Sequence, residues 1–265
     1  MQIDDRKSVV IDFFQQFNRT TTALLLLDYD GTLAPFQTDR HQAYPYPGIV
    51  PILERIIGSG RTKLAIVSGR PVIEIQNLLS QLTDFEIWGA HGLEHLSADG
   101  FYRRTEIEPN TLAIIRQAED WLLQAGLLPI TEIKPGGIAV HWRGLSASEV
   151  EHVQSRIQEG WNKFEGVQGI KLLAFDGGIE LRAARPDKGD VIDAILKTTD
   201  AATPVAFLGD DFTDEDAFRV LNGRGLSVLV RHEYRKTIAD AWLQPPQELI
   251  DFLATWSDIA GMGTR

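Results

Sequence analysis

Predominantly apolar runs of four or five residues recur along the chain, separated by segments with helical periodicity. The runs predict strands that are buried on both faces, as in the middle of a parallel sheet. The strands are expected at 23–27, 63–67, 86–90, 205–208 and 226–230, and the helices at 8–17, 49–59, 71 to about 81, 191–196 and 247–256. An alternation of this kind is typical of an α/β core with a mostly parallel sheet.

The pattern changes between residues 107 and 184. In order, this segment predicts a helix to Gln124, a hairpin over 131–143 that turns at Pro135-Gly136-Gly137, a helix over 146–163, and two strands, 169–175 and 178–184, joined near Asp176. Helix, hairpin, helix, hairpin is an α+β order, whereas the flanking parts have a βαβ order. We therefore expect a core of residues 1–106 and 185–265 and an inserted α+β cap of residues 107–184.

Net charge and cysteine content narrow the chemistry of an otherwise ordinary globular composition. A formal net charge of −11 over 265 residues argues against a nucleic-acid partner. An anionic substrate would also be repelled, unless a bound cation and local basic groups reverse the field at the site. Because the chain has no cysteine, a disulfide, a zinc–thiolate site and a thiol nucleophile are excluded.

The chain shows no membrane or export signal. No apolar run approaches the roughly 18 residues of a membrane span, and the N-terminus lacks the pattern of a signal peptide. We therefore expect a cytoplasmic protein without a membrane partner. The sequence does not fix the oligomeric state, and a monomer is favoured.

Two carboxylates directly follow the predicted strand 23–27. Asp28 and Asp30 are two positions apart, so along an extended strand their side chains point the same way, and Gly31 allows a tight turn beyond them. Two acids at the rim of a core need a neutralising cation, and an oxygen-rich site suits a hard ion such as Mg²⁺. The alternative is that Asp28 caps a turn and that Asp-Gly is ordinary turn chemistry.

Polar residues also stand at the ends of other predicted core elements. Ser68 follows the strand 63–67, where open α/β sheets bind ligands, so its hydroxyl can donate to a phosphate oxygen. The alternative for Ser68 is to cap the next helix. Lys188 lies near a helix N-terminus, which the helix dipole alone makes unfavourable for a cation. Lys188 is either solvated, or it faces Asp28 and a phosphate and offsets their charge.

Five carboxylates follow the predicted strand 205–208. A helix start accounts for the acids at 214–216, because Thr213 and the last of them have capping-box spacing and acids are favoured in a first turn. Capping leaves Asp210 and Asp211 unexplained. Since they stand at a strand end, we expect them to complete a magnesium site, with Asp210 as a direct ligand and Asp211 behind it.

Charged residues in the predicted cap come in pairs two positions apart, which places each pair on one face of its strand. The pairs are Glu132 with Lys134, His141 with Arg143, and Glu180 with Arg182. If all three pairs face one way, the cap presents carboxylates and cations that suit the hydroxyls of a sugar. The alternative is the solvated face of a half-buried sheet.

Four short strings carry a family resemblance. Asp28-Tyr-Asp-Gly-Thr-Leu33, after its apolar strand, resembles the first motif of the haloacid dehalogenase-like phosphohydrolases. Ser68-Gly69-Arg70, Lys188-Gly189 and Gly209-Asp210-Asp211 are similar to the other three motifs, in the family's order. More narrowly, the chain resembles the trehalose-6-phosphate phosphatase family over most of its length. The segments that carry this narrower resemblance are 28–35, 68–70, 91–92, 132–134, 141–143, 180–182 and 209–215.

The resemblance implies a Rossmann-like three-layer α/β core with an inserted α+β cap, and magnesium-dependent hydrolysis of a small-molecule sugar phosphate through an aspartyl-phosphate. In this mechanism Asp28 is the nucleophile and Asp30 the general acid and base. Mg²⁺ is bound by Asp28, the Asp30 carbonyl and Asp210, with Asp211 behind them. The implied phosphate-binding residues are Thr32, Ser68, Gly69, Arg70 and Lys188, and the implied sugar-binding residues are Glu132, Lys134, His141, Arg143, Glu180 and Arg182.

Two departures from the family pattern lie in the cap. The family commonly has a serine shortly after the cap lysine and a tyrosine between the histidine and the arginine, where this chain has Pro135-Gly136-Gly137 and Trp142. Since only the cap distinguishes substrates, phosphatases for sucrose-, glucosylglycerol- and mannosylglycerate-type phosphates stay open. A non-catalytic sugar-phosphate-binding regulatory module is the alternative from another class, although the intact acids and lysine argue against it. No Gly-x-x-x-x-Gly-Lys-Ser/Thr loop occurs, which disfavours a nucleoside-triphosphate-binding protein.

Overall fold

The computed structural model describes residues 3–175 and 177–262, so the turn expected at Asp176 lies outside the described residues. The chain forms two compact units, one of Met1–Arg103 with Asp187–Arg265 and one of Arg104–Pro186. Along the chain, the second unit is thus inserted into the first. Its function as a substrate-recognising cap stays a prediction. Among the described helices, none combines the length and the hydropathy needed to cross a membrane.

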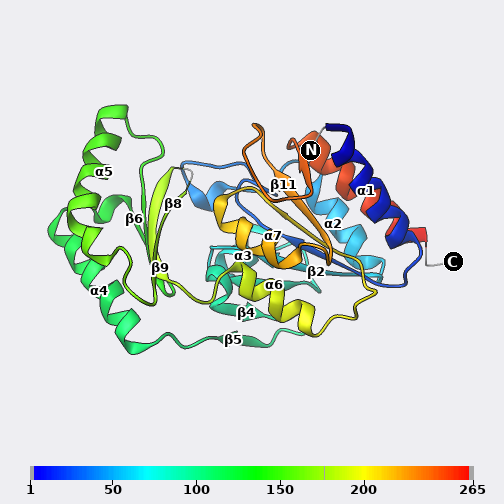
Figure 1. Ribbon diagram of the computed structural model, residues 1–265, viewed down its shortest axis with the longest axis horizontal. Helices are drawn as coiled ribbons and strands as arrows, with labels where there is room; N and C mark the ends of the chain where they lie inside the picture. Colours follow the sequence, from blue (N-terminus) through cyan, green and yellow to red (C-terminus); the bar gives the residue numbers. More distant parts are fainter. Residues whose placement is uncertain (1–2, 176, 263–265) are drawn as a thin grey trace. The chain divides into compact units, whose positions relative to one another are not determined.

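The first unit is built on an eight-stranded sheet with the order β12-β11-β10-β1-β2-β3-β4-β5 (Figure 1). The strands are β1 Ala23–Leu27, β2 Thr62–Val67, β3 Glu86–Gly89, β4 Glu94–Leu96, β5 Tyr102–Arg104, β10 Val205–Gly209, β11 Leu226–Val230 and β12 Ala241–Leu243. Neighbouring strands from β12 through to β3 are parallel, and β4 is antiparallel to β3. The mostly parallel sheet expected from the apolar runs is therefore confirmed.

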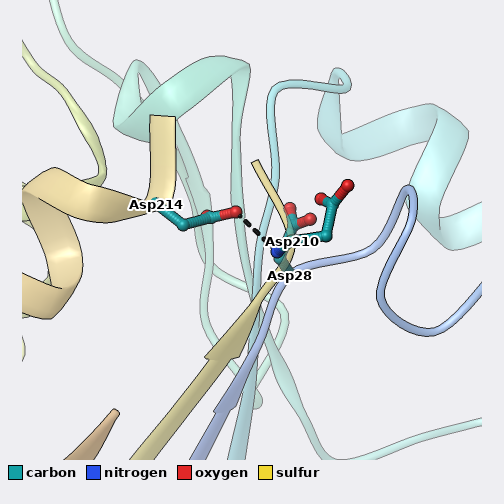
Figure 2. Close-up of side chains that lie close together, drawn as sticks. All are labelled: Asp28, Asp210 and Asp214. Carbon is teal, nitrogen blue, oxygen red and sulfur yellow. Dashed lines mark hydrogen bonds between the residues drawn. The ribbon is translucent and has the colours of Figure 1, made fainter. Parts of the chain in front are cut away.

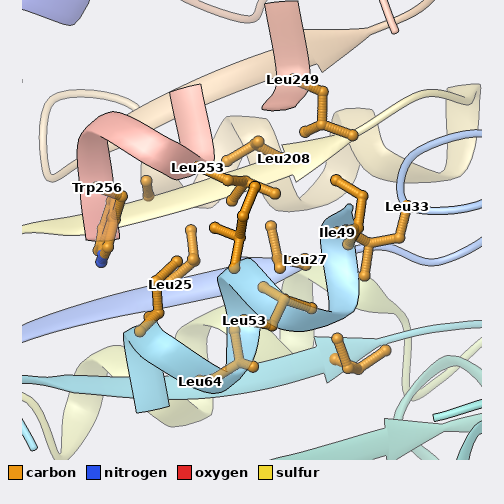
Figure 3. Packing of buried hydrophobic residues seen from close by; sticks show 14 of the residues in the cluster. Leu25, Leu27, Leu33, Ile49, Leu53, Leu64, Leu208, Leu249, Leu253 and Trp256 are labelled. Carbon is orange, nitrogen blue, oxygen red and sulfur yellow. The ribbon is translucent and has the colours of Figure 1, made fainter. Parts of the chain in front are cut away.

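Helices cover both faces of this sheet. They are α1 Ile3–Asn18, α2 Ile49–Gly58, α3 Val72–Leu78, α6 Lys188–Lys197, α7 Glu215–Leu221 and α8 Gln247–Gly261, with short 3-10 turns η1 Arg40–Gln42, η2 Ala90–Gly92 and η5 Phe212–Asp214. Leu25 and Leu27 of β1 pack in the core that α1, α2, α3 and α8 cover (Figure 3). Leu26, between them, packs in the core that α6 and α7 cover. Because successive strand residues face opposite ways, one apolar run supplies both cores, and the three-layer architecture is confirmed.

The second unit contains a four-stranded antiparallel sheet with the order β6-β7-β9-β8. Its elements are α4 Pro109–Gln124, η3 Leu128–Ile130, β6 Thr131–Lys134, β7 Gly137–His141, α5 Ala147–Trp161, η4 Asn162–Phe164, β8 Ile170–Phe175 and β9 Gly178–Ala183. Ile138, Val140 and Leu181 of the sheet form a buried core with Ile115 of α4 and Ile157 of α5. Both helices therefore pack on the same face of the sheet.

Three strands of the first unit, β4, β5 and β12, do not follow from the sequence pattern. Each is three residues long, too short for an alternation of polar and apolar positions to be visible. In β4, His95 stacks on Trp88 of β3 with ring centroids 3.9 Å apart, so a polar residue takes a packing position. The helix expected to reach about residue 81 ends earlier, at Leu78.

The C-terminal helix α8 docks on the first unit through Trp256. This side chain is fully buried, and its ring centroid lies 4.8 Å from that of Phe17 and 5.6 Å from that of Phe13 in α1. Its indole N–H donates to the Thr62 hydroxyl over 3.0 Å, so its polar atom is also satisfied. A large aromatic side chain with a buried hydrogen bond contributes strongly to stability.

We expect Trp256→Ala to lower the free energy of unfolding by about 3–5 kcal/mol, because it leaves a cavity and removes the partner of a buried hydroxyl. Urea unfolding followed by circular dichroism measures the change. Thr255→Ala is the matched control, since this exposed neighbour on the same helix donates its hydroxyl to the Asp251 carbonyl one turn earlier. A change within about 0.5 kcal/mol is expected for the control. Equal effects of the two variants would contradict the docking role of Trp256.

Candidate active site

The predicted site residues of the core meet at one edge of the sheet. Asp28 follows β1, Asp210 follows β10 and Ser68 follows β2, and these three strands are neighbours in the order β10-β1-β2. The Asp28 amide donates to the Leu208 carbonyl over 2.9 Å, which ties the end of β1 to the end of β10. All three side chains are buried. The carboxyl ends of parallel strands thus place these polar groups together, as expected.

Lys188 joins this group from the first position of α6. Its ammonium donates to Asp28 Oδ1 and to Asp214 Oδ1, each over 2.6 Å, and all three side chains are buried. Asp187 caps the helix in a capping box with Asp190, which fixes where the helix starts. Of the two interpretations of Lys188, the solvated one is wrong, and the lysine faces Asp28.

Burial governs the electrostatics of the cluster. Burial raises the pKa of Asp28 from its ordinary 3.8 to about 7, and the charge of Lys188 offsets only part of this effect. Burial and the nearby Asp28 likewise raise the pKa of Asp210 well above its usual value. Burial alone would lower the pKa of Lys188, but Asp214 and Asp28 raise it above its usual value. One ammonium is therefore shared among more buried carboxylates than it can neutralise.

Asp28, Asp210 and Asp214 form a group that fits a divalent cation. One carboxylate oxygen from each residue lies within 4.8 Å of the others (Figure 2). Within the described part of the chain, Asp210 Oδ2 is buried and has no hydrogen-bond partner. Carboxylate oxygens are hard donors that suit a hard metal ion. Such an ion would neutralise the negative charge of the carboxylates that Lys188 does not offset.

Gly31 allows this group to be compact. Its φ is +80°, a conformation that side-chain-bearing residues rarely adopt, and a Cβ atom there would lie 2.2 Å from Asp210 Oδ2. The turn after Asp28 is therefore closed against Asp210, and only glycine fits between them. The expected need for a tight turn at Gly31 is confirmed, and the close approach of Asp210 gives it a second reason.

Asp214 is the site residue that the sequence analysis missed. The capping box expected between Thr213 and Asp216 is wrong: the box joins Asp211 and Asp214 instead. Asp214 Oδ2 accepts from the amides of Asp210 and Asp211, each over 2.9 Å, while its Oδ1 takes Lys188. The one feature of the sequence that accompanies this role is the glycine at position 209. A Cβ atom there would lie 2.4 Å from Asp214 Cγ.

Asp30 and Thr32, which follow β1, bind different partners. The Asp30 carboxylate accepts two hydrogen bonds from the Arg70 guanidinium, from Nε over 2.6 Å and from the terminal nitrogen Nη2 over 2.7 Å. Arg70 also donates to Glu74 over 3.2 Å. The Thr32 hydroxyl donates to Asp28 Oδ2 over 3.4 Å. Arg70, expected at the phosphate, thus engages two carboxylates in this structure, and its phosphate contact stays a prediction.

A strained turn supports the Ser68-Gly69-Arg70 loop. The amides of Ala90 and His91 donate to the carbonyls of Arg70 and Ser68 over 2.8 and 3.0 Å. Both donors have positive φ, at 48° and 57°. A Cβ at Gly69 would lie 2.7 Å from His91 Nε2, so a larger residue there would displace the imidazole ring. The Ser68 hydroxyl accepts from the Arg70 amide over 3.2 Å, a bond within the loop. Because α3 begins after Pro71 without a side-chain cap, the alternative that Ser68 caps this helix is wrong.

In the second unit, the expected charged face exists. The strand register places Glu132, Lys134, His141, Glu180 and Arg182 on the face of the sheet opposite α4 and α5. Lys134 lies 2.8 Å from Glu180, and His141 lies 2.9 Å from Glu132. Arg182 also lies 3.7 Å from Glu180. These charged groups therefore form one continuous network across three strands.

The two remaining cap residues of interest lie just beyond β7. Arg143 packs at Gly177, where a Cβ atom would lie 3.0 Å from its guanidinium. Trp142 packs against the apolar core on the helix side of the sheet. A polar face on the second unit is thus confirmed, whereas sugar binding by any of its residues stays a prediction.

Comparison with known proteins adds three likenesses. A curated trehalose-phosphate phosphatase of Mycobacterium tuberculosis is 28% identical over 242 residues, covering 86% of this chain and 59% of that protein, so the chain spans about three fifths of the relative's length. The C-terminal domain of Candida albicans trehalose-6-phosphate phosphatase is similar in structure, with a TM-score of 0.80, 19% identity and coverage of 94% of this chain and 96% of that one. The C-terminal domain of the Candida albicans trehalose synthase regulatory protein is also similar, with a TM-score of 0.65, 13% identity and coverage of 92% and 97%.

The two structural likenesses show the fold alone, because their sequence identity is low. The family assignment comes from the sequence. The model of the trehalose-phosphatase family matches residues 26–244, a range that starts inside β1 and includes Asp28, Lys188 and Asp214. With most of its length matched and the buried acids and lysine of the site inside that match, this chain belongs to the trehalose-phosphatase family.

Proposed function

We propose that this chain is a magnesium-dependent phosphatase that hydrolyses trehalose 6-phosphate to trehalose and phosphate through an aspartyl-phosphate intermediate. The observation that carries the proposal is the buried Asp28 carboxylate, held by Lys188 beside Asp210 and Asp214 at the sheet edge. A carboxylate in this setting is positioned by an ammonium rather than solvated, as a nucleophile at phosphorus requires. The family match supplies the substrate class.

The first step transfers the phosphoryl group to the protein. A carboxylate oxygen of Asp28 attacks phosphorus in line, the bond from phosphorus to the sugar oxygen breaks, and that oxygen takes a proton from the Asp30 carboxyl. In the second step Asp30 takes a proton from water, which attacks phosphorus and releases Asp28 and inorganic phosphate. Because Asp30 is paired with Arg70 in this structure, its carboxyl must leave the guanidinium to serve either step.

Cations stabilise the phosphoryl group during transfer. Asp28, the Asp30 carbonyl and Asp210 would hold Mg²⁺, with the Asp214 carboxylate beside them, and the bound ion would neutralise charge on the phosphoryl oxygens. Lys188 contributes a second positive charge at Asp28, and its two carboxylate partners keep it protonated. We assign Ser68 and the backbone of Gly69 to donate to the phosphate oxygens. Asp211 is assigned to a supporting position behind the metal, where its side chain accepts from the Phe212 amide.

We assign recognition of the disaccharide to the charged face of the second unit. In the network of Glu132, Lys134 and Glu180, hydrogen-bond acceptors alternate with a donor, which matches the hydroxyls of a sugar. Gly137, which has no side chain, and Ala139, which has only a methyl group, lie between these residues on the same face and leave the charged groups room to meet. Arg143, His141 and Arg182 are the further residues assigned to this recognition.

Asp28→Asn is expected to lower phosphate release from trehalose 6-phosphate by about 10³-fold or more, because the amide is a poor nucleophile. A panel of sugar phosphates, assayed with Mg²⁺ and with EDTA, measures both the loss and the substrate preference. Asp193→Asn is the matched control, since it makes the same change at an exposed carboxylate of α6. Preference for another sugar phosphate would replace the substrate assignment, and no turnover by the wild type would favour a regulatory sugar-phosphate-binding module.

The raised pKa of Asp28 predicts a pH dependence of stability in metal-free buffer. Between pH 3.8 and about 7 the folded state retains a proton that the unfolded state has lost, so stability falls as pH rises through this window. The expected slope from this one group is on the order of 1 kcal/mol per pH unit. Chemical unfolding at several pH values in EDTA, compared between the wild type and Asp28→Asn, isolates the contribution. Identical slopes in the two proteins would contradict the raised pKa.

Alanine substitution of Glu132, Lys134, Arg143 or Glu180 is expected to raise the KM for trehalose 6-phosphate about tenfold or more, because each removes a hydrogen bond to the sugar. Turnover of p-nitrophenyl phosphate, which has no sugar, should change little. Glu151→Ala, an exposed change on the helix side of the same unit, is the control. Unchanged KM in all four variants would remove the second unit from substrate recognition.

A further inference from the structure

Arg235, in the loop between β11 and β12, holds the acidic turn after β10. Arg235 donates from Nε to the Asp210 carbonyl over 3.3 Å and from Nη2 to the Asp211 carbonyl over 2.7 Å. The guanidinium carbon also lies 4.6 Å from the centre of the Phe212 ring. Three consecutive residues of the turn are therefore in contact with one arginine that is more than twenty positions away in sequence.

Glu215, the first residue of α7, holds the same loop from the other side. Its carboxylate accepts from the third arm of the Arg235 guanidinium, from the Thr237 hydroxyl over 2.7 Å and from the Ile238 amide over 3.1 Å. The Arg235 and Glu215 side chains are only 12% and 17% exposed, so their charges interact with limited screening. Turn and loop thus hold each other through a pair of opposite charges, which we call the Arg235–Glu215 clamp.

The clamp acts on the backbone of Asp210, whose carboxylate has few constraints of its own. Asp210 Oδ2 has no hydrogen-bond partner in the described part of the chain, and the Arg231 guanidinium lies 3.9 Å from it. The direction of the carboxylate is therefore set by its main chain. That main chain is held at both polar atoms, the amide by Asp214 and the carbonyl by Arg235. Without Arg235, the Asp210–Asp211 peptide keeps its Asp214 bond at the Asp211 amide but loses the one at its carbonyl, so it can tilt and redirect the carboxylate.

We propose that Arg235 is a positioning residue for the metal ligand Asp210, and that the Arg235–Glu215 clamp sets the affinity of the site for its divalent cation. The inference rests on the proposed function, which assigns Asp210 to Mg²⁺. Arg235 acts through the backbone carbonyls of Asp210 and Asp211. Groups that orient metal ligands in this way contribute about 10–100-fold to metal affinity in other proteins.

The test is the dissociation constant of Mg²⁺, measured by titration calorimetry on the whole chain without substrate. Arg235→Met keeps the length of the side chain but removes every hydrogen bond, and we expect the Kd for Mg²⁺ to rise about tenfold or more. Glu215→Gln keeps the shape of the clamp but removes its charge pair, and a smaller rise is expected. This milder variant keeps the test decisive if Arg235→Met does not fold. Arg219→Met is the matched control, because Arg219 forms a solvent-accessible ion pair with Asp216 on α7. The Kd of this variant for Mg²⁺ should equal that of the wild type.

Kinetics distinguish positioning from a merely structural role. At saturating Mg²⁺, Arg235→Met should regain a kcat near that of the wild type with an unchanged KM for the sugar phosphate, while its half-saturating Mg²⁺ concentration stays raised. A lower melting temperature in EDTA with an unchanged Kd for Mg²⁺ would overturn the proposal and leave the phosphatase assignment standing. A wild type that binds Mg²⁺ but hydrolyses no sugar phosphate would overturn the phosphatase assignment alone. No binding of Mg²⁺ by the wild type would overturn the positioning proposal.

Discussion

The active-site edge depends on one constraint, the burial of more negative charge than a single ammonium can neutralise. Asp28, Asp210 and Asp214 are all buried, and Lys188 is the buried cation that contacts two of them. Such a cluster is costly unless its partners are held in place, because an isolated buried charge is strongly unfavourable. Under the proposed function, this excess of negative charge serves to bind a divalent metal ion.

Much of the surrounding structure serves to hold this cluster. Gly31 brings the turn after β1 against Asp210, and Gly209 gives room to Asp214. The side chain of Asp214 takes two successive amides of the acidic turn, while Arg235 takes two successive carbonyls of the same turn. The backbone there is therefore fixed by side chains rather than by a sheet or a helix. Loops held in this way can place ligands accurately while lying outside regular structure.

The fold of this chain does not by itself identify its chemistry. A trehalose-6-phosphate phosphatase domain and the domain of a trehalose synthase regulatory protein both resemble this chain in structure, so the architecture does not decide between catalysis and regulation. The side chains carry the decision. The buried Asp28, paired with Lys188 beside two further acids, is the feature that supports the proposed phosphoryl transfer.

The sequence by itself determined the core strands, because runs such as 23–27 must be buried on both faces, and it determined the edge where Asp28, Ser68 and Asp210 meet, because parallel strands end together. Strand alternation also determined the charged face of the second unit. The short strands, the pairing of Arg70 with Asp30 and the role of Asp214 were decided only by the tertiary structure. The Arg70–Asp30 and Lys188–Asp214 contacts join residues 40 and 26 positions apart. Local spacing fits a helix cap equally well at Asp214, and only the folded chain shows which partner its carboxylate meets.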